Sequence, residues 1–80
     1  LRFTGWAARL VSERRWHPSQ QIEWNGNLDD ELIMTLELSS FEEIRRWILS
    51  WGPQVEVLEP KELREEIEEA VAGVLALYRN

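Results

Sequence analysis

The spacing of hydrophobic residues changes along the chain, and each change marks an expected element. Residues 1–4 form a short β-type stretch, and after Gly5 the apolar residues 6, 7, 10 and 11 recur at helical spacing. We expect this first helix to end near Arg14 and Arg15, because a helix cannot continue through Pro18 and the residue before a proline avoids helical geometry. The start of the chain therefore predicts a strand followed by a helix.

A β-hairpin is expected next. Ile22 and Trp24 alternate with polar residues over 20–24, and Asn25-Gly26 suits the positive φ angles of a tight turn. From Glu31 to Leu38 the even-numbered residues are all apolar and would share one face of a second strand.

Two more helices enclose another short strand. Ser40 and Glu43 have the spacing of a capping box, which marks the start of a helix. An apolar stripe follows at residues 41, 44, 47, 48 and 51. We expect the two tryptophans of this stripe to lie in the core rather than to form a stacking platform. Gly52-Pro53 should end this helix. Residues 55–58 form an apolar strand, and a helix starting at Glu59-Pro60 follows it.

The resulting order, β-α-β-β-α-β with an additional C-terminal helix, predicts an α+β fold of the ferredoxin-like split βαβ type, an antiparallel sheet covered on one face by two helices. Eighty residues suffice for one core only, so we treat 1–80 as a single domain. Because the chain opens at Leu1 without a methionine, directly in a strand, we expect it to be a fragment of a longer protein.

Charge and composition narrow the function. The formal net charge of -6 disfavours direct binding of DNA by this fragment. With no cysteine and one histidine, the sequence excludes disulfides, thiolate catalysis and the common zinc sites, and we expect no metal and no cofactor. It contains no apolar run that could span a membrane and no signal peptide, so we expect a cytoplasmic location without membrane partners.

The segment from Arg14 to Gln20, here called the corner, is the main candidate site. It combines guanidinium, indole, imidazole and amide groups, which suit a polar or anionic ligand with a flat ring. The candidate ligand-binding residues are Arg14, Arg15, Trp16, His17 and Gln20. The competing interpretation is a helix C-terminus, where arginines favour the negative end of the dipole and the tryptophan covers the core.

Catalysis is not expected. His17 and Ser19 could form a base and nucleophile, but no orienting carboxylate or oxyanion donors are evident. Asp29, Asp30 and Glu31 lack the spacing of a calcium loop and are more typical of a solvated turn.

The last helix is apolar from Ala70 onward, and this is more apolar surface than a core of this size needs. Whether it packs on its own sheet, on another domain or on a second subunit is open.

Three motifs carry a family resemblance: residues 15–20 (RWHPSQ), residues 47–52 (WILSWG) and residues 55–64 (VEVLEPKELR), followed by Tyr78. Together they resemble the C-terminal extension domain, called WCX, of the WYL-domain transcriptional regulators of bacteria. The most specific part is the helix ending in Gly52, followed by a buried strand and a helix opened by Pro60.

The resemblance implies a parent protein in which a winged helix-turn-helix binds DNA, a WYL barrel senses a ligand that is often nucleic acid, and the extension contributes to dimerisation and to the ligand site. This chain has no WYL motif, so the ligand-binding residues of that barrel cannot be carried over. We therefore predict a non-catalytic regulatory and dimerisation domain that forms a homodimer, with DNA bound by the missing helix-turn-helix. The alternative is a module that senses a small molecule, a nucleotide or a nucleic-acid effector through the corner.

Overall fold

A computed structural model describes residues 1–25 and 31–79. The elements in chain order are β1 (Arg2–Thr4), α1 (Gly5–Ser12), β2 (Gln21–Trp24), β3 (Glu31–Thr35), α2 (Glu42–Ser50), the 3-10 helix η1 (Gly52–Gln54), β4 (Val55–Glu56) and α3 (Lys61–Tyr78). The chain is thus an α+β domain whose described residues form one four-stranded sheet and three α-helices. The predicted turn at Asn25-Gly26 and the carboxylates Asp29 and Asp30 lie wholly or partly outside the described residues.

The strands lie in the order β2-β3-β1-β4, and all neighbouring strands are antiparallel. The predicted hairpin pairing is confirmed, with Ile22 opposite Met34 and Trp24 opposite Leu32. Two strands are shorter than the hydrophobic pattern indicated: β3 ends at Thr35, and β4 covers only Val55–Glu56.

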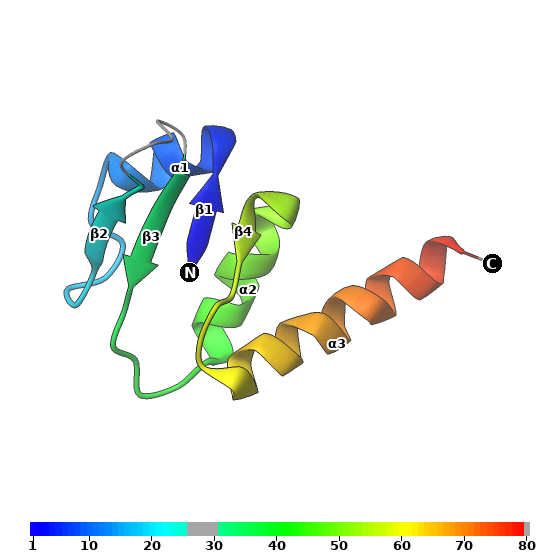
Figure 1. Ribbon diagram of the computed structural model, residues 1–80. Coiled ribbons are helices and arrows are strands. Elements are labelled where there is room, and N and C mark those ends of the chain that lie inside the picture. Colours follow the sequence, from blue (N-terminus) through cyan, green and yellow to red (C-terminus); the bar gives the residue numbers. More distant parts are fainter. Residues whose placement is uncertain (26–30, 80) are drawn as a thin grey trace.

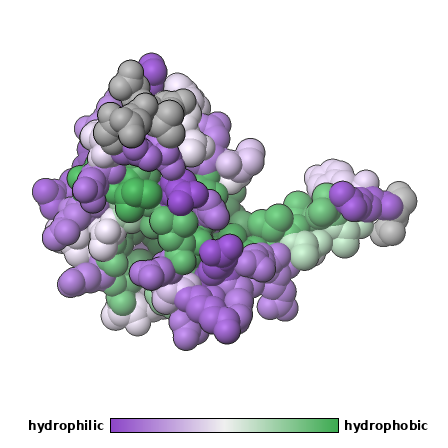
Figure 2. All heavy atoms as spheres, viewed as in Figure 1, coloured by the Kyte–Doolittle hydropathy of each residue, from purple (hydrophilic) through white to green (hydrophobic). Residues whose placement is uncertain are grey.

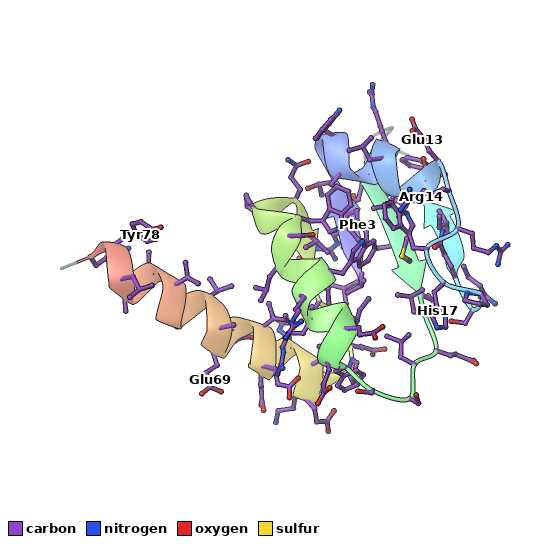
Figure 3. The ribbon with its side chains drawn as sticks, turned by 180° about the vertical axis from the view of Figure 1, so that it is seen from behind. Phe3, Glu13, Arg14, His17, Glu69 and Tyr78 are labelled. Carbon is purple, nitrogen blue, oxygen red and sulfur yellow. The ribbon has the colours of Figure 1, made fainter. Side chains whose placement is uncertain are left out.

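Both α1 and α2 cover the same face of the sheet, and Figure 3 shows them in front of the strands. The larger core cluster joins Phe3 of β1 and Leu32 and Met34 of β3 to three α1 residues, Ala7, Ala8 and Val11. The smaller cluster consists of Ile48, Val57 and Leu63, which are all at most 4% exposed. It ties α2, the segment after β4 and the first turn of α3 together.

The opposite face of the sheet carries charged side chains. Arg2 on the central strand β1 forms ion pairs with Glu31 on β3 (3.1 Å) and Glu56 on β4 (2.9 Å), so one guanidinium bridges three strands. These pairs are partly exposed, which limits each to about 1 kcal/mol or less.

The end of α1 differs from the prediction. The helix ends at Ser12 instead of near Arg14 and Arg15, because the indole Nε1 of Trp16 donates to the carbonyl oxygen of Val11 (3.0 Å), which a longer helix would have used. At the other end no side chain of α1 caps the helix; Gln54 of η1 accepts a hydrogen bond from the Ala7 N–H (2.8 Å).

Two smaller predictions were also wrong. Trp6, expected on the apolar face of α1, is 68% exposed, and Ala8 is buried in its place. The Ser40 hydroxyl accepts from the Glu42 N–H (3.3 Å) rather than from Glu43, so the expected capping box is replaced by a bond one residue earlier, and α2 begins at Glu42. The predicted stop at Gly52 is confirmed by its φ of +61°.

The last helix leaves the body of the domain after its first two turns (Figure 1). Leu63 is buried and Ile67 is partly buried, whereas residues 71–79 are all exposed. The molecule is consequently elongated, with extents of 41 × 29 × 20 Å.

Candidate functional site

The corner is a tight loop between α1 and β2 that is held mainly by its own hydrogen bonds. The Gln20 side chain accepts from the Trp16 N–H through Oε1 (2.7 Å) and donates to the Arg14 carbonyl through Nε2 (3.2 Å). Arg15 donates to the Pro18 carbonyl (3.0 Å). Gln20 therefore uses its amide to close the loop, which leaves it little capacity for a ligand.

Trp16 belongs to an aromatic cluster with Phe3, Trp47 and Trp51. Its ring centroid lies 5.3 Å from that of Trp47 and 6.2 Å from that of Trp51. Both Trp47 in α2 and Trp51 just after it also contact Phe3 edge-on. The Arg14 guanidinium carbon lies 3.9 Å from the centroid of Trp16, which is a cation–π arrangement. Trp47 and Trp51 thus pack against the core as expected, and Trp16 connects them to the rest of the corner.

His17 is fixed by Ser19. The His17 Nδ1 accepts from the Ser19 backbone N–H (3.1 Å) and lies 2.7 Å from the Ser19 hydroxyl. The same hydroxyl accepts from the Glu37 N–H (2.8 Å) and lies 3.2 Å from the Glu37 carbonyl oxygen. Ser19 therefore joins the corner to the segment after β3, a structural role that engages the hydroxyl on both sides.

A groove of about 810 Å³ lies between the corner, the segment after β3 and the start of α2. Its lining residues are Trp16, His17, Leu36, Glu37, Leu38, Ser39, Ser40, Glu42, Glu43, Ile44 and Trp47. Figure 3 shows His17 on this side of α2 and the tip of α3 with Tyr78 on the other side. The walls are aromatic and aliphatic, while Glu37, Glu42 and Glu43 supply carboxylates. Such a groove suits a ligand with an apolar body and a positive charge better than an anion.

The five predicted residues do not gather in one cavity. Trp16 and His17 line the groove, whereas Arg15 and Gln20 line a smaller depression of about 290 Å³ on the other side of the loop. Arg14 lies on the Trp16 ring and lines neither of the two.

The prediction missed the α2 side of the groove. Ile44 and Trp47 follow the same apolar stripe as the core residues, so sequence spacing alone did not distinguish a groove wall from a core position. Leu36 and Leu38, which the alternation placed within the second hairpin strand, lie past the end of β3 and line the opposite side of the groove.

Within 1–25 and 31–79, no three histidine, aspartate or glutamate side chains come together in a group that could hold a metal ion. In the same residues, no helix has both the length and the apolar character to cross a membrane.

Most of the large apolar side chains that are exposed in the described residues lie on α3. Figure 2 shows hydrophobic residues along the part of the helix that leaves the body. The exposed large side chains on it are Val71 (50%), Val74 (53%), Leu75 (46%), Leu77 (76%) and Tyr78 (82%). Contiguous apolar surface of this kind is typical of an interaction site.

These features define a small α+β domain with a two-helix layer on one sheet face and a projecting apolar helix. The family model of the WCX domain matches residues 1–75, and the chain belongs to this family. The match covers all three motifs on which the resemblance rests. Neither the curated proteins nor the solved structures compared with the chain gave a match.

Proposed function

We propose that this chain is a non-catalytic regulatory and dimerisation domain of a WYL-type transcriptional regulator. Membership in the WCX family supports this context, because the family resemblance implies a parent protein with a separate DNA-binding part. The net charge of -6 supports assigning DNA contacts to that other part and not to this domain. The effector of such a parent would be a small ligand or a nucleic acid.

The strand order supports the finer fold assignment within this proposal. In a ferredoxin-like split βαβ fold, the first and third strands are central and all neighbours are antiparallel. The order β2-β3-β1-β4 and the antiparallel pairs fit that pattern, with α3 as the additional C-terminal helix.

The observation that carries dimerisation is the exposed apolar half of α3. An isolated surface leucine needs no explanation, but five large apolar side chains on one projecting helix do. A second subunit in a homodimer would remove them from water.

Light scattering of the purified chain over a wide concentration range tests the proposal. A mass near twice 9.5 kDa that persists on dilution supports it. As a matched pair, Val74→Glu should yield a monomer, whereas Glu69→Gln, on the polar side of the same helix, should leave the dimer intact. A monomer at every concentration for the unaltered chain contradicts dimerisation by this domain.

The groove supports a second candidate function, the sensing of a small molecule. Its aromatic walls and three carboxylates favour a compound with a flat apolar body and an amine over a nucleotide. Phenethylamine and ATP serve as paired probes in an NMR titration.

Saturable shifts at the His17 ring and the Trp47 indole with phenethylamine, lost in His17→Ala and kept in Gln21→Ala, support groove binding. Saturable shifts with ATP that Arg15→Ala abolishes while folding survives would favour a nucleotide at the corner instead. No shift with either probe counts against the candidate.

A further inference from the structure

We propose that α3 pairs with α3 of a second copy of this chain in antiparallel orientation, so that the exposed apolar stripe of each helix covers that of the other. This inference rests on the proposed dimerisation and adds to it the interface, its direction and its register.

The stripe begins in the core and continues outside it. Leu63 is 4% exposed and Ile67 is partly buried, and Val71, Val74 and Tyr78 continue along the same helical face with exposures of 50%, 53% and 82%. The face that anchors α3 to its own body is therefore the face left uncovered further out. A partner that covers it lies against the side of the body from which α3 projects.

The neighbouring surface of α2 fits this placement. Arg45 pairs with Glu66 of α3 at 3.8 Å, so this side of α2 faces α3. Leu49 lies one turn after Arg45 on the same side and is 37% exposed. A second helix along the free part of α3 would also approach Leu49, which extends the apolar contact beyond a single pair of helices.

The charge distribution selects the direction. Residues 61–69 contain five glutamates against Lys61 and Arg64, whereas residues 70–79 contain one charged side chain, Arg79. Parallel pairing would align the two acidic halves and repel. Antiparallel pairing separates them and brings Arg79 of each copy toward the acidic half of the other.

The position of the body selects the same direction. The body sits at the N-terminal base of α3, and the free half of the helix extends away from it (Figure 1). In a parallel pair both bodies would compete for space at the same end, whereas an antiparallel pair places them at opposite ends. The uncovered stripe runs from about Ile67 to Tyr78, so its midpoint lies between Val71 and Val74, and Ile67 of one copy faces the partner's Tyr78.

The absence of cysteine makes a direct cross-linking test clean. Ile67→Cys and Tyr78→Cys are prepared singly, and a short bismaleimide is added to each alone and to their mixture. We expect covalent dimer from the mixture and little from either variant alone. Glu66→Cys and Arg79→Cys, at exposed rim positions, form a second pair that leaves the apolar stripe unchanged.

Light scattering of the same samples separates the two levels of the proposal. A monomer before cross-linking contradicts the proposed dimer, and the antiparallel pairing of α3 is then wrong as well. A dimer in which each variant cross-links with itself, and the mixture gains nothing, overturns the antiparallel direction while dimerisation stands. A dimer with no cross-link at either pair of positions overturns α3 as the interface.

Discussion

At the scale of single residues, the side chains of the corner hold the loop together more than they form an open ligand-binding site. Its amide, indole and imidazole each already bond within the protein: Gln20 to Trp16 and Arg14, Trp16 to Val11, and His17 to Ser19. A buried polar group that loses its partner destabilises the fold by about 1–3 kcal/mol, so these bonds matter for folding. The groove beside the corner is lined by the carboxylate side chains of Glu37, Glu42 and Glu43.

Gln20→Ala should lower the free energy of unfolding by about 1–3 kcal/mol, because the half-buried Trp16 N–H and the Arg14 carbonyl both lose a partner. Gln20→Glu retains the acceptor for the Trp16 N–H and loses only the donor to the Arg14 carbonyl. Its free energy of unfolding should therefore lie between those of Gln20→Ala and the unaltered chain. Urea unfolding followed by tryptophan fluorescence measures both. Gln21→Ala, at an exposed neighbouring position, is the control. Equal stability of Gln20→Ala and the unaltered chain would show that the amide does not close the loop.

His17 should be the Nε2–H tautomer in the neutral form. The Nδ1 atom accepts from the Ser19 backbone N–H, and a ring nitrogen that accepts cannot carry a proton of its own. Nitrogen-15 NMR of the imidazole distinguishes the protonated from the unprotonated ring nitrogen at a pH where the ring is neutral. A proton on Nδ1 would instead make that atom a donor to the Ser19 hydroxyl oxygen, which lies 2.7 Å away, and the Ser19 backbone N–H would lose its acceptor.

At the scale of elements, the sequence predicts correctly those features that are determined by residues close together in the chain. The Gly52-Pro53 stop, the alternation of Ile22 and Trp24 and the apolar stripe of α2 depend on a few neighbouring residues, and all three hold in the structure. The end of α1 depends instead on Trp16 folding back onto Val11, and such a contact has no signature in residue spacing.

The same distinction applies to the candidate site. The residue types of the corner could be read from the sequence, but their partners could not, because the Gln20 and Ser19 bonds form only when the loop closes. Three segments that are separate in the sequence line the groove, so no single motif could predict it. Hydrophobic spacing predicted the stripe on α3 without indicating what covers it.

Gly52 and Gly73 should respond in opposite directions to substitution by alanine. Gly52 has a φ of +61°, so Gly52→Ala should destabilise the domain by about 1–2 kcal/mol through backbone strain alone, since an added Cβ meets nothing within 4 Å. Gly73 lies inside α3, where an added Cβ also meets nothing within 4 Å, and Gly73→Ala should stabilise the helix by up to about 1 kcal/mol. Thermal unfolding followed by circular dichroism measures both. A loss of stability in Gly73→Ala would indicate close approach of another helix at this position.

At the scale of the whole molecule, the domain divides into a self-sufficient body and a projecting arm. Core residues come from β1, β3, α1, α2 and the segment around β4, and α3 contributes one buried side chain, Leu63. The outer half of α3 has no intramolecular packing that would stabilise it, and an isolated helix segment of this length is marginal in water. Its order in a functional assembly is therefore expected to depend on a partner.

A chain that ends at Glu69 tests this division. We expect it to fold to a monomer with an unfolding free energy within about 0.5 kcal/mol of the monomeric full chain, because the lost residues bury almost nothing in the body. Leu63→Ala in the truncated chain should remove about 2–4 kcal/mol, since Leu63 anchors the helix in the smaller core cluster.

Concentration dependence completes the test, because association stabilises the folded state by mass action. The urea midpoint of the full chain should rise with protein concentration, whereas that of the truncated chain should stay constant. Sedimentation velocity on the same samples measures the mass directly. If the truncated chain unfolds or aggregates while Leu63 and Ile67 are intact, the outer half of α3 supports the body, and the division into body and arm is wrong. If both chains show constant midpoints and monomeric mass, the arm is not used for self-association, and its apolar stripe must serve a different partner.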